Sequence, residues 1–316
     1  IIAIHNTKRG PALGGCRFFG YHGEDDQKKD VLKLSKAMTY KNSLADLDFG
    51  GGKATINSRV SKNKMYELYG KMLDHLDGSY ITAGDIGIVD QDLVELKKYT
   101  SYVCSTKGTD SGQSTAYGVF NAILGYNEFK YDSSSIENKK IVLKGFGKVG
   151  SRLAHFCKEV GAIVEVVDFE SNRSLIENAG FKFLSKYQNT SFDSIDIFSP
   201  CATGGDLNTE FIEFANSVNI DCVIGAANNQ LENNTIEKNL FDMGITFCPD
   251  YCVNAGGVII LALRSSIKED MEYLDTEAKN KLIGIKNQLI KILTLSKEKN
   301  QLTTVSSNEL AEAGFQ

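Results

Sequence analysis

The sequence predicts an α/β protein made of two domains. Its 316 residues exceed what one small hydrophobic core requires. Strand-like and helix-like segments alternate along almost the whole chain, and one apolar strand over 140–144 runs directly into a glycine-rich turn that opens a helix. Repeated strand–helix units of this length imply a parallel sheet covered by helices on both faces.

The first third of the chain predicts short strands that alternate with amphipathic helices. Residues 1–5 are typical of a strand already under way, so we expect further residues upstream. Apolar residues at helical spacing predict helices over 28–45, 64–76 and 91–99. Strands are predicted over 54–56 and 80–82, and the second of them leads into Gly84 and Asp85.

The rest of the chain predicts a regular series of βα units. A helix over 114–129 precedes strands over 140–144, 162–168, 195–199, 221–226 and 245–248, which alternate with helices over 148–160, 171–179, 209–217 and 233–243. Helices over 254–267 and 276–299 follow, and the apolar stripe of the last helix is expected to pack in a core. The predicted domains are 1–112, completed by C-terminal helices over about 286–316, and 113–285.

Composition excludes several classes of partner. Hydrophobic residues make up 42% and charged residues 24%, as in ordinary globular proteins. The net charge of −5 argues against a nucleic-acid partner, which needs a basic surface. No apolar run approaches the length of a membrane span, and no basic N-terminal region indicates a signal peptide, so we expect a cytoplasmic protein.

The cysteines indicate reduced thiols, and no metal site is expected. Seven cysteines are scattered along the chain without a C-x-x-C pair, and an odd number does not suit a disulfide framework. Cys248 and Cys252 have ligand-like spacing, but His155 is the only histidine after residue 76. Ligands for zinc are therefore too scarce.

The glycine-rich turn predicts a dinucleotide site of the Rossmann type. Gly145, Gly147 and Gly150 form a G-x-G-x-x-G motif, with Lys148 and Val149 inside it, between an apolar strand and a helix. The glycines allow a tight turn, close approach of a pyrophosphate and close packing of helix on strand. Asp168 ends the next strand, where a carboxylate accepts from the ribose 2′-hydroxyl and repels a 2′-phosphate. NAD is therefore the expected cofactor, although Arg173 lies near enough to leave NADP open.

Two lysines and an aspartate predict acid–base chemistry in the first domain. Lys53 follows three glycines, which remove the Cβ atoms that would block close approach of backbone and substrate. Lys41 lies twelve residues upstream and Asp85 further on. A desolvated lysine beside a second cation can lose its proton near neutral pH, as a general base must.

These residues belong to a set of motifs that resembles one enzyme family over essentially the whole chain. The set resembles the leucine/phenylalanine/valine branch of the amino-acid dehydrogenases, relatives of glutamate dehydrogenase, with leucine dehydrogenase closest. The matching stretches, besides Gly50-Gly-Gly-Lys53, are Gly10-Pro-Ala-Leu-Gly-Gly-Cys-Arg17, Ala37-Met-Thr-Tyr-Lys-Asn42, Thr82-Ala-Gly-Asp-Ile-Gly87, Ser114-Thr-Ala-Tyr-Gly-Val119, Pro200-Cys-Ala-Thr-Gly-Gly205, Gly225-Ala-Ala-Asn-Asn-Gln-Leu231 and Pro249-Asp-Tyr-Cys-Val-Asn-Ala-Gly-Gly-Val258.

The resemblance implies a substrate domain and a Rossmann domain separated by a cleft, and a homo-oligomer. It also implies reversible, NAD-dependent oxidative deamination of an amino acid to a 2-oxo acid and ammonia. By motif, Lys41 would bind the substrate α-carboxylate, Lys53 would activate water as general base, and Asp85 would shuttle protons at the amino group.

The resemblance also implies which side chains select the substrate. Glutamate dehydrogenases carry a lysine just before the Gly14-Gly15 pair, where it binds the substrate's side-chain carboxylate. Leu13 stands there in this sequence, and a buried carboxylate facing leucine would lack a partner. An apolar substrate is therefore expected, and a branched-chain amino acid is favoured. The implied substrate-contacting residues, besides Lys41, are Leu13, Gly14, Ala83, Asn229, Asn254, Val258 and Leu261.

Further cofactor contacts follow from the same motifs. The resemblance implies that Thr115 meets the nicotinamide carboxamide, that Cys201 and Ala202 flank the adenosine side, and that Ala227 and Asn229 lie near the nicotinamide. Two alternatives stay open on the sequence alone. One keeps the chemistry but uses phenylalanine, tryptophan or a biosynthetic amino acid, and the other is a non-catalytic NAD-binding paralogue.

Overall fold

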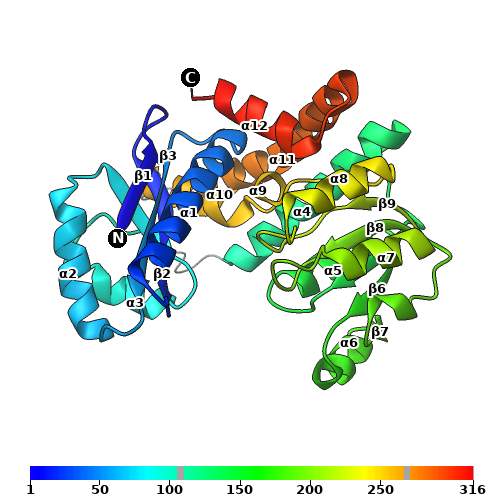
Figure 1. Ribbon diagram of the computed structural model, residues 1–316, viewed down its shortest axis with the longest axis horizontal. Helices are drawn as coiled ribbons and strands as arrows, with labels where there is room; N and C mark the ends of the chain where they lie inside the picture. Colours follow the sequence, from blue (N-terminus) through cyan, green and yellow to red (C-terminus); the bar gives the residue numbers. More distant parts are fainter. Residues whose placement is uncertain (105–109, 267–270, 316) are drawn as a thin grey trace. The chain divides into compact units, whose positions relative to one another are not determined.

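The protein is described by a computed structural model that covers residues 1–104, 110–266 and 271–315 (Figure 1). The chain forms two compact units. Unit 1 comprises Ile1–Asp110, Val258–Lys281 and Leu310–Gln316, and unit 2 comprises Ser111–Gly257 and Leu282–Glu309. Residues 258–281 thus group with unit 1 and most of 286–316 with unit 2, while the functional domain limits stay a prediction.

Unit 1 is built on a four-stranded sheet with the strand order β1-β3-β2-β4. Strands β2, β3 and β4 are mutually parallel, and β1 is antiparallel to β3. The strands are β1 (Ile2–Asn6), β2 (Ala12–Phe19), β3 (Gly50–Asn57) and β4 (Tyr80–Gly84). Parallel neighbours bring the carboxyl ends of β2, β3 and β4 to one edge.

Helices cover both faces of this sheet (Figure 1). On one face α2 (Lys62–His75) and α3 (Asp90–Leu96) pack Met65, Leu73 and Leu93 against strand residues such as Ala54 and Tyr80. On the other face α1 (Glu24–Leu44) lies so close to β3 that a Cβ atom at Gly51 would be 2.0 Å from the Thr39 backbone nitrogen. The glycine run of β3 therefore has a packing reason.

Unit 2 carries a six-stranded, wholly parallel sheet with the order β10-β9-β8-β5-β6-β7. If β5 is numbered 1 and the later strands follow in chain order, the sheet runs 3-2-1-4-5-6 from β7 to β10. This is the strand order of dinucleotide-binding folds. The Rossmann-type fold predicted from the sequence is confirmed. The strands are β5 (Lys140–Lys144), β6 (Ile163–Val167), β7 (Lys182–Leu184), β8 (Ser194–Pro200), β9 (Asn219–Val223) and β10 (Thr246–Phe247).

The helices of unit 2 pack through apolar faces. Phe211 and Phe214 of α7 and Leu240 of α8 join the core cluster that contains Val142 and Phe198 of the sheet. Helices α4 and α5 contact each other through aromatic rings. The helices are α4 (Ser111–Tyr131), α5 (Gly150–Glu159), α6 (Arg173–Asn178), α7 (Thr209–Ser217), α8 (Asn234–Asp242) and α9 (Asp250–Val253).

Three helices at the end of the chain contribute to both units. They are α10 (Gly256–Ser266), α11 (Met271–Lys299) and α12 (Thr303–Ala313). Ser43 donates to the Ala311 carbonyl at 2.7 Å, and Tyr40 to the Glu312 carboxylate at 2.5 Å. These bonds fix the last residues of the chain against α1 within unit 1.

Most predicted elements are present, with some differences. Strands β2 and β7 had not been predicted, and α12 had been predicted only as one of the C-terminal helices over about 286–316, without bounds of its own. The helix predicted over 254–267 is α10, which begins at Gly256; the short helix α9 before it had not been predicted, and Ile267 lies outside the described residues. The helix predicted over 171–179 reduces to a short 3₁₀ turn over Glu170–Asn172 followed by α6.

Two features concern the chain as a whole. All seven cysteines are free thiols, six of them buried. Within the described ranges, none of the helices combines the length and the apolar character needed to cross a membrane.

A buried carboxylate fastens the outer part of the unit 2 sheet. Glu165 on β6 is 3% exposed and accepts hydrogen bonds from Lys182 on β7 at 2.8 Å, from Thr190 at 2.6 Å and from the Ser191 hydroxyl. Burial alone would raise the pKa of this carboxyl, but the bonds from Lys182, Ser191 and Thr190 outweigh it, so the pKa lies below its usual value.

The Glu165→Gln variant is expected to lose about 2 kcal/mol of stability, because a charge-assisted network becomes partly unsatisfied. A depressed folded-state pKa contributes stability that is present above about pH 4.5 and is lost as pH falls through the folded-state value. Urea unfolding between pH 3 and pH 7 should therefore show a smaller acid loss in Glu165→Gln than in the wild type. The exposed Glu24→Gln is the matched control, and equal acid losses in all three proteins would contradict the assignment.

Candidate active site

Lys53 and Asp85, far apart in the sequence, form a buried ion pair in unit 1. Lys53 lies on β3 and Asp85 directly follows β4. Lys53 Nζ lies 2.9 Å from Asp85 Oδ2, and the two side chains are 8% and 22% exposed. Since charged groups are buried only when they are paired, this pair is the strongest candidate for chemistry in unit 1.

The glycine pair of β2 makes room for this contact. Strand β2 lies between β3 and β4, so the two residues bridge about 10 Å of sheet. The register places Gly14 and Gly15 of β2 beside Lys53. A Cβ atom at Gly15 would lie 2.5 Å from the Gly84 carbonyl oxygen and 2.9 Å from Asp85 Cβ. Any side chain there would displace Asp85.

Asp85 is held as a carboxylate. Burial alone would raise the pKa of its carboxyl, but the positive charges of Lys53 and Arg17 and a hydrogen bond from the Ile86 backbone outweigh it. The pKa therefore lies below its usual value. Lys53 in turn faces a carboxylate that also binds Arg17, while the proximity of Lys41 to Lys53 stays a prediction.

A second ion pair extends from Asp85 and was missed at the sequence level. Arg17 Nε lies 3.1 Å from Asp85 Oδ2, and Arg17 Nη1 lies 3.1 Å from Asp30 Oδ2 on α1. The Tyr21 hydroxyl donates to Asp30 at 2.6 Å. The signal available in the sequence was an arginine inside a stretch of small, buried residues, which requires a partner.

The residues predicted to contact substrate are distributed over both units. Lys41 is half-buried in the last turn of α1, and Leu13, Gly14 and Ala83 are buried in the sheet of unit 1. Asn42 donates to the Leu13 and Gly50 carbonyls at 3.3 and 2.6 Å, which fixes both glycine-containing strands. Val258 and Leu261 are half-buried on α10. Contact of these residues with a substrate stays a prediction.

The G-x-G-x-x-G turn has the geometry that a dinucleotide needs. Gly145 has φ +102°, and a Cβ atom there would lie 2.8 Å from the Ala202 backbone nitrogen. A Cβ at Gly150, where α5 begins, would lie 1.9 Å from the Gly145 carbonyl oxygen. A Cβ at Gly147 would meet nothing within 4 Å, so this side of the turn is open to a pyrophosphate beside the helix N-terminus. Lys148 is exposed and Val149 half-buried.

Asp168 follows β6 and lies against the same turn. Its carboxylate accepts from the Phe146 backbone N–H at 2.5 Å, from the Phe169 N–H at 2.7 Å and from Asn172 Nδ2 at 2.9 Å. Arg173, the residue that left NADP open, is bound to Glu170 at 2.5 Å and to Glu177 at 3.3 Å. Its guanidinium is thus already paired with two carboxylates.

The loops after β8 and β9 lie beside the turn, because β8 and β5 are neighbours at the point where the strand order reverses. The Cys201 N–H donates to the Lys144 carbonyl at 2.7 Å, and Ala202 is exposed. Ala227 is buried, and its backbone N–H donates to the Pro200 carbonyl at 3.0 Å. Asn229 is exposed with φ +52°, and its N–H donates to Asp250 at 2.7 Å.

Thr115 and Asn254 are two further polar residues of unit 2, predicted to contact the nicotinamide and the substrate. Thr115 on α4 donates to the Ser111 carbonyl at 2.8 Å, a bond within its own helix. Asn254 is buried and donates to Asn228 Oδ1 at 2.8 Å and to the Ala226 carbonyl at 3.1 Å. Within the described ranges its Oδ1 has no hydrogen-bond partner. An unsatisfied buried acceptor of this kind fits a site completed by a bound molecule.

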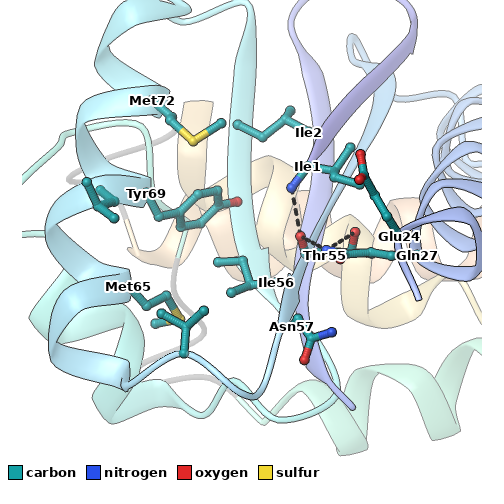
Figure 2. A pocket seen from close by; sticks show the side chains of 12 residues that line it. Ile1, Ile2, Glu24, Gln27, Thr55, Ile56, Asn57, Met65, Tyr69 and Met72 are labelled. Atoms are coloured by element: carbon teal, nitrogen blue, oxygen red, sulfur yellow. Dashed lines mark hydrogen bonds between the residues drawn. The ribbon is translucent and has the colours of Figure 1, made fainter. Parts of the chain in front are cut away.

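A cavity of about 360 Å³ in unit 1 is a separate feature (Figure 2). It opens beside β1, β3 and α2 and is lined mainly by apolar side chains, among them Ile2, Ile56, Met65 and Met72. Neither Lys53 nor Asp85 lines it. The predicted chemistry is therefore not assigned to this cavity.

Comparisons with known proteins agree with the geometry. Residues 1–102 match the family described as Glu/Leu/Phe/Val dehydrogenase, dimerisation domain, and residues 167–315 match Glutamate/Leucine/Phenylalanine/Valine dehydrogenase. Phenylalanine dehydrogenase from Caldalkalibacillus thermarum is 35% identical over 332 residues, covering 100% of this chain and 87% of that protein. Leucine dehydrogenase from Bacillus subtilis is 34% identical over 322 residues, covering 99% and 86%.

A solved structure agrees with the same assignment. The crystal structure of L-tryptophan dehydrogenase from Nostoc punctiforme superposes with a TM-score of 0.87 at 32% identity, covering 99% of this chain and 90% of that one. Matches over both halves of the chain, together with relatives above 30% identity over nearly its full length, establish the family. The chain belongs to the leucine/phenylalanine/valine branch of the Glu/Leu/Phe/Val dehydrogenases, which are oxidoreductases acting on the CH–NH2 group of amino acids.

Proposed function

We propose that this protein catalyses reversible, NAD-dependent oxidative deamination of an apolar L-amino acid, with a branched-chain side chain favoured. The observation that carries the proposal is the buried Lys53–Asp85 pair, 2.9 Å between Nζ and Oδ2, in a chain of this family with an open dinucleotide turn. A lysine and a carboxylate in contact supply the base and the proton carrier that deamination requires.

The roles of the residues follow from their chemistry and from the family resemblance. Lys41 would bind the substrate α-carboxylate as a compact cation. Bound NAD would accept the hydride that leaves the α-carbon. Lys53 would then take a proton from the water that adds to the resulting imine carbon. Asp85 would carry protons to and from the substrate nitrogen as ammonia departs.

NAD is proposed as the cofactor, held by the turn at Gly145, Gly147 and Gly150 and by Asp168. A 2′-phosphate would face the Asp168 carboxylate, and the neighbouring cation, Arg173, already binds Glu170 and Glu177. Both facts favour a ribose with a free 2′-hydroxyl.

The substrate side chain is proposed to be apolar because Leu13, Ala83, Val258 and Leu261 are all aliphatic. Relatives named phenylalanine, valine, leucine and tryptophan dehydrogenases match this chain at 34–40% identity, so the preference proposed among apolar amino acids rests on these side chains alone. One methylene in such a pocket changes selectivity by about 1–3 kcal/mol, which favours leucine, valine or isoleucine only modestly.

A homo-oligomer in the cytoplasm is proposed as the working form. Residues 1–102 match a domain described as a dimerisation domain. The seven free cysteines suit a reducing compartment.

The substrate class is tested by NADH formation at alkaline pH with leucine, valine, phenylalanine, tryptophan and glutamate, each with NAD and with NADP. We expect turnover with the apolar amino acids, little with glutamate, and a preference for NAD. A protein that binds NAD but is silent with every amino acid would instead be a non-catalytic NAD-binding paralogue.

The base role is tested by Lys53→Ala, for which we expect kcat to fall at least about a hundredfold while the Kd for NAD stays nearly unchanged. Lys62→Ala removes another ion-paired lysine of unit 1, 2.7 Å from Asp92, and should keep its activity. A substantial residual rate in Lys53→Ala would remove Lys53 from this role.

The pocket assignment is tested by Leu13→Lys, which places an ammonium where a side-chain carboxylate would lie. The ratio of kcat/KM for glutamate to that for leucine should rise at least about tenfold, and Leu13→Met should leave it low. Because Leu13 is fully buried, thermal unfolding must first show that both variants fold. A folded Leu13→Lys protein with an unchanged ratio would place the side-chain pocket elsewhere.

A further inference from the structure

We propose that Arg17 is a positioning residue for this reaction: it holds the Asp85 carboxylate beside Lys53 and supplies it with a permanent positive charge when Lys53 gives up its proton. The inference rests on the proposed function, because it concerns the proton transfers assigned to Lys53 and Asp85. It adds a residue to which no catalytic part had been given.

The geometry places two cations on one oxygen. Asp85 Oδ2 lies 2.9 Å from Lys53 Nζ and 3.1 Å from Arg17 Nε. The two donors come from different strands, β3 and β2, and approach a carboxylate that follows β4. Two donors on one oxygen fix the orientation of the carboxylate better than one. Because the oxygen is shared, its attraction for each of the two cations is weaker than for a single partner.

The charges explain why the second cation matters. When Lys53 acts as a base it must be neutral, and Asp85 then loses its nearest positive charge. A carboxylate only 22% exposed is costly without a counter-charge and would take up a proton instead. Arg17 prevents this, because a guanidinium keeps its charge throughout the pH range of enzymes. Asp85 can therefore stay ionised while Lys53 is neutral.

Arg17 is itself held from the other side. Its Nη1 lies 3.1 and 3.3 Å from the two oxygens of Asp30, which also accepts the Tyr21 hydroxyl at 2.6 Å. Arg17 is 17% exposed, so it is enclosed together with its partners. Burial alone would lower the pKa of Arg17, but Asp85 and Asp30 outweigh it.

The other titratable groups facing this cluster stay neutral. Cys16 of β2 and Tyr80 of β4 lie within electrostatic range of Asp85. Burial raises the pKa of the Cys16 thiol to about 12 and raises that of Tyr80 further. The Tyr21 hydroxyl likewise has a raised pKa, through burial and its bond to Asp30. Lys53 and Arg17 are therefore the charged partners of Asp85 in this cluster, and Asp30 pairs with Arg17.

The test uses two variants whose effects on the pH profile have opposite signs. Arg17→Met removes a positive charge, so the cluster holds its protons more tightly, and both limbs of the kcat/KM profile for deamination should move to higher pH, by about one unit. Asp30→Asn removes a negative charge with little change of shape, so both limbs should move to lower pH by several tenths of a unit.

Three controls separate this effect from a loss of structure. Arg17→Lys keeps the charge but not the forked hydrogen bonds, so its rate should fall while its profile stays near that of the wild type. Arg9→Met removes an arginine of unit 1 that pairs with the exposed Asp46 and should leave the profile unchanged. Thermal unfolding reports whether each variant folds. If Arg17→Met does not fold, Asp30→Asn carries the test alone.

The outcomes are distinguishable. Opposite shifts in Arg17→Met and Asp30→Asn support the role of Arg17. Shifts of the same sign, or unchanged profiles in a folded and active protein, overturn that role and leave the proposed function intact. A wild-type protein without activity toward any amino acid overturns the proposed function and this inference together.

Discussion

The candidate site of unit 1 depends on one contact, the ion pair that Lys53 and Asp85 form across β2. Lys53 is buried with Asp85 as its counter-charge, whereas Asp85 is held by both Lys53 and Arg17. The contact in turn requires that β2 carry no side chain against Asp85, which Gly15 provides. The close packing of the strand backbones and the candidate catalytic pair therefore depend on the same few residues.

Much of this organisation follows from local sequence. Strand β5 and helix α7 have the predicted bounds, because an apolar run before glycine and a helix opened by the Asn208 cap are strong local signals. Strand β2 had not been predicted, since its glycines and alanine lack a clear period-two pattern. The bounds of helix α12 had not been predicted either, because its polar sequence carries only a weak apolar stripe.

The candidate site shows the same limit. A lysine after a glycine run and an aspartate after a strand could be proposed from motifs, and the fold brings them into contact. The involvement of Arg17 with Asp30 could not be predicted, because the two meet only when α1 packs on the sheet. The direct contact of Lys53 with Asp85, and of Arg17 with the same oxygen, appears only in the folded chain. Which charges face a buried group depends on tertiary packing, which local patterns do not encode.

The packing of the glycines sets which parts of this enzyme can change during evolution. A Cβ atom at Gly15 or Gly51 would collide with neighbouring backbone atoms. Replacing another side chain nearby cannot relieve such a collision, so both positions require glycine. The aliphatic positions 258 and 261 lie on one helix and are half-buried, and they tolerate changes of size. Relatives named for leucine, valine, phenylalanine and tryptophan match this chain at 34–40% identity. On the proposed pocket, libraries that seek a new substrate should therefore vary its aliphatic side chains and leave these glycines untouched.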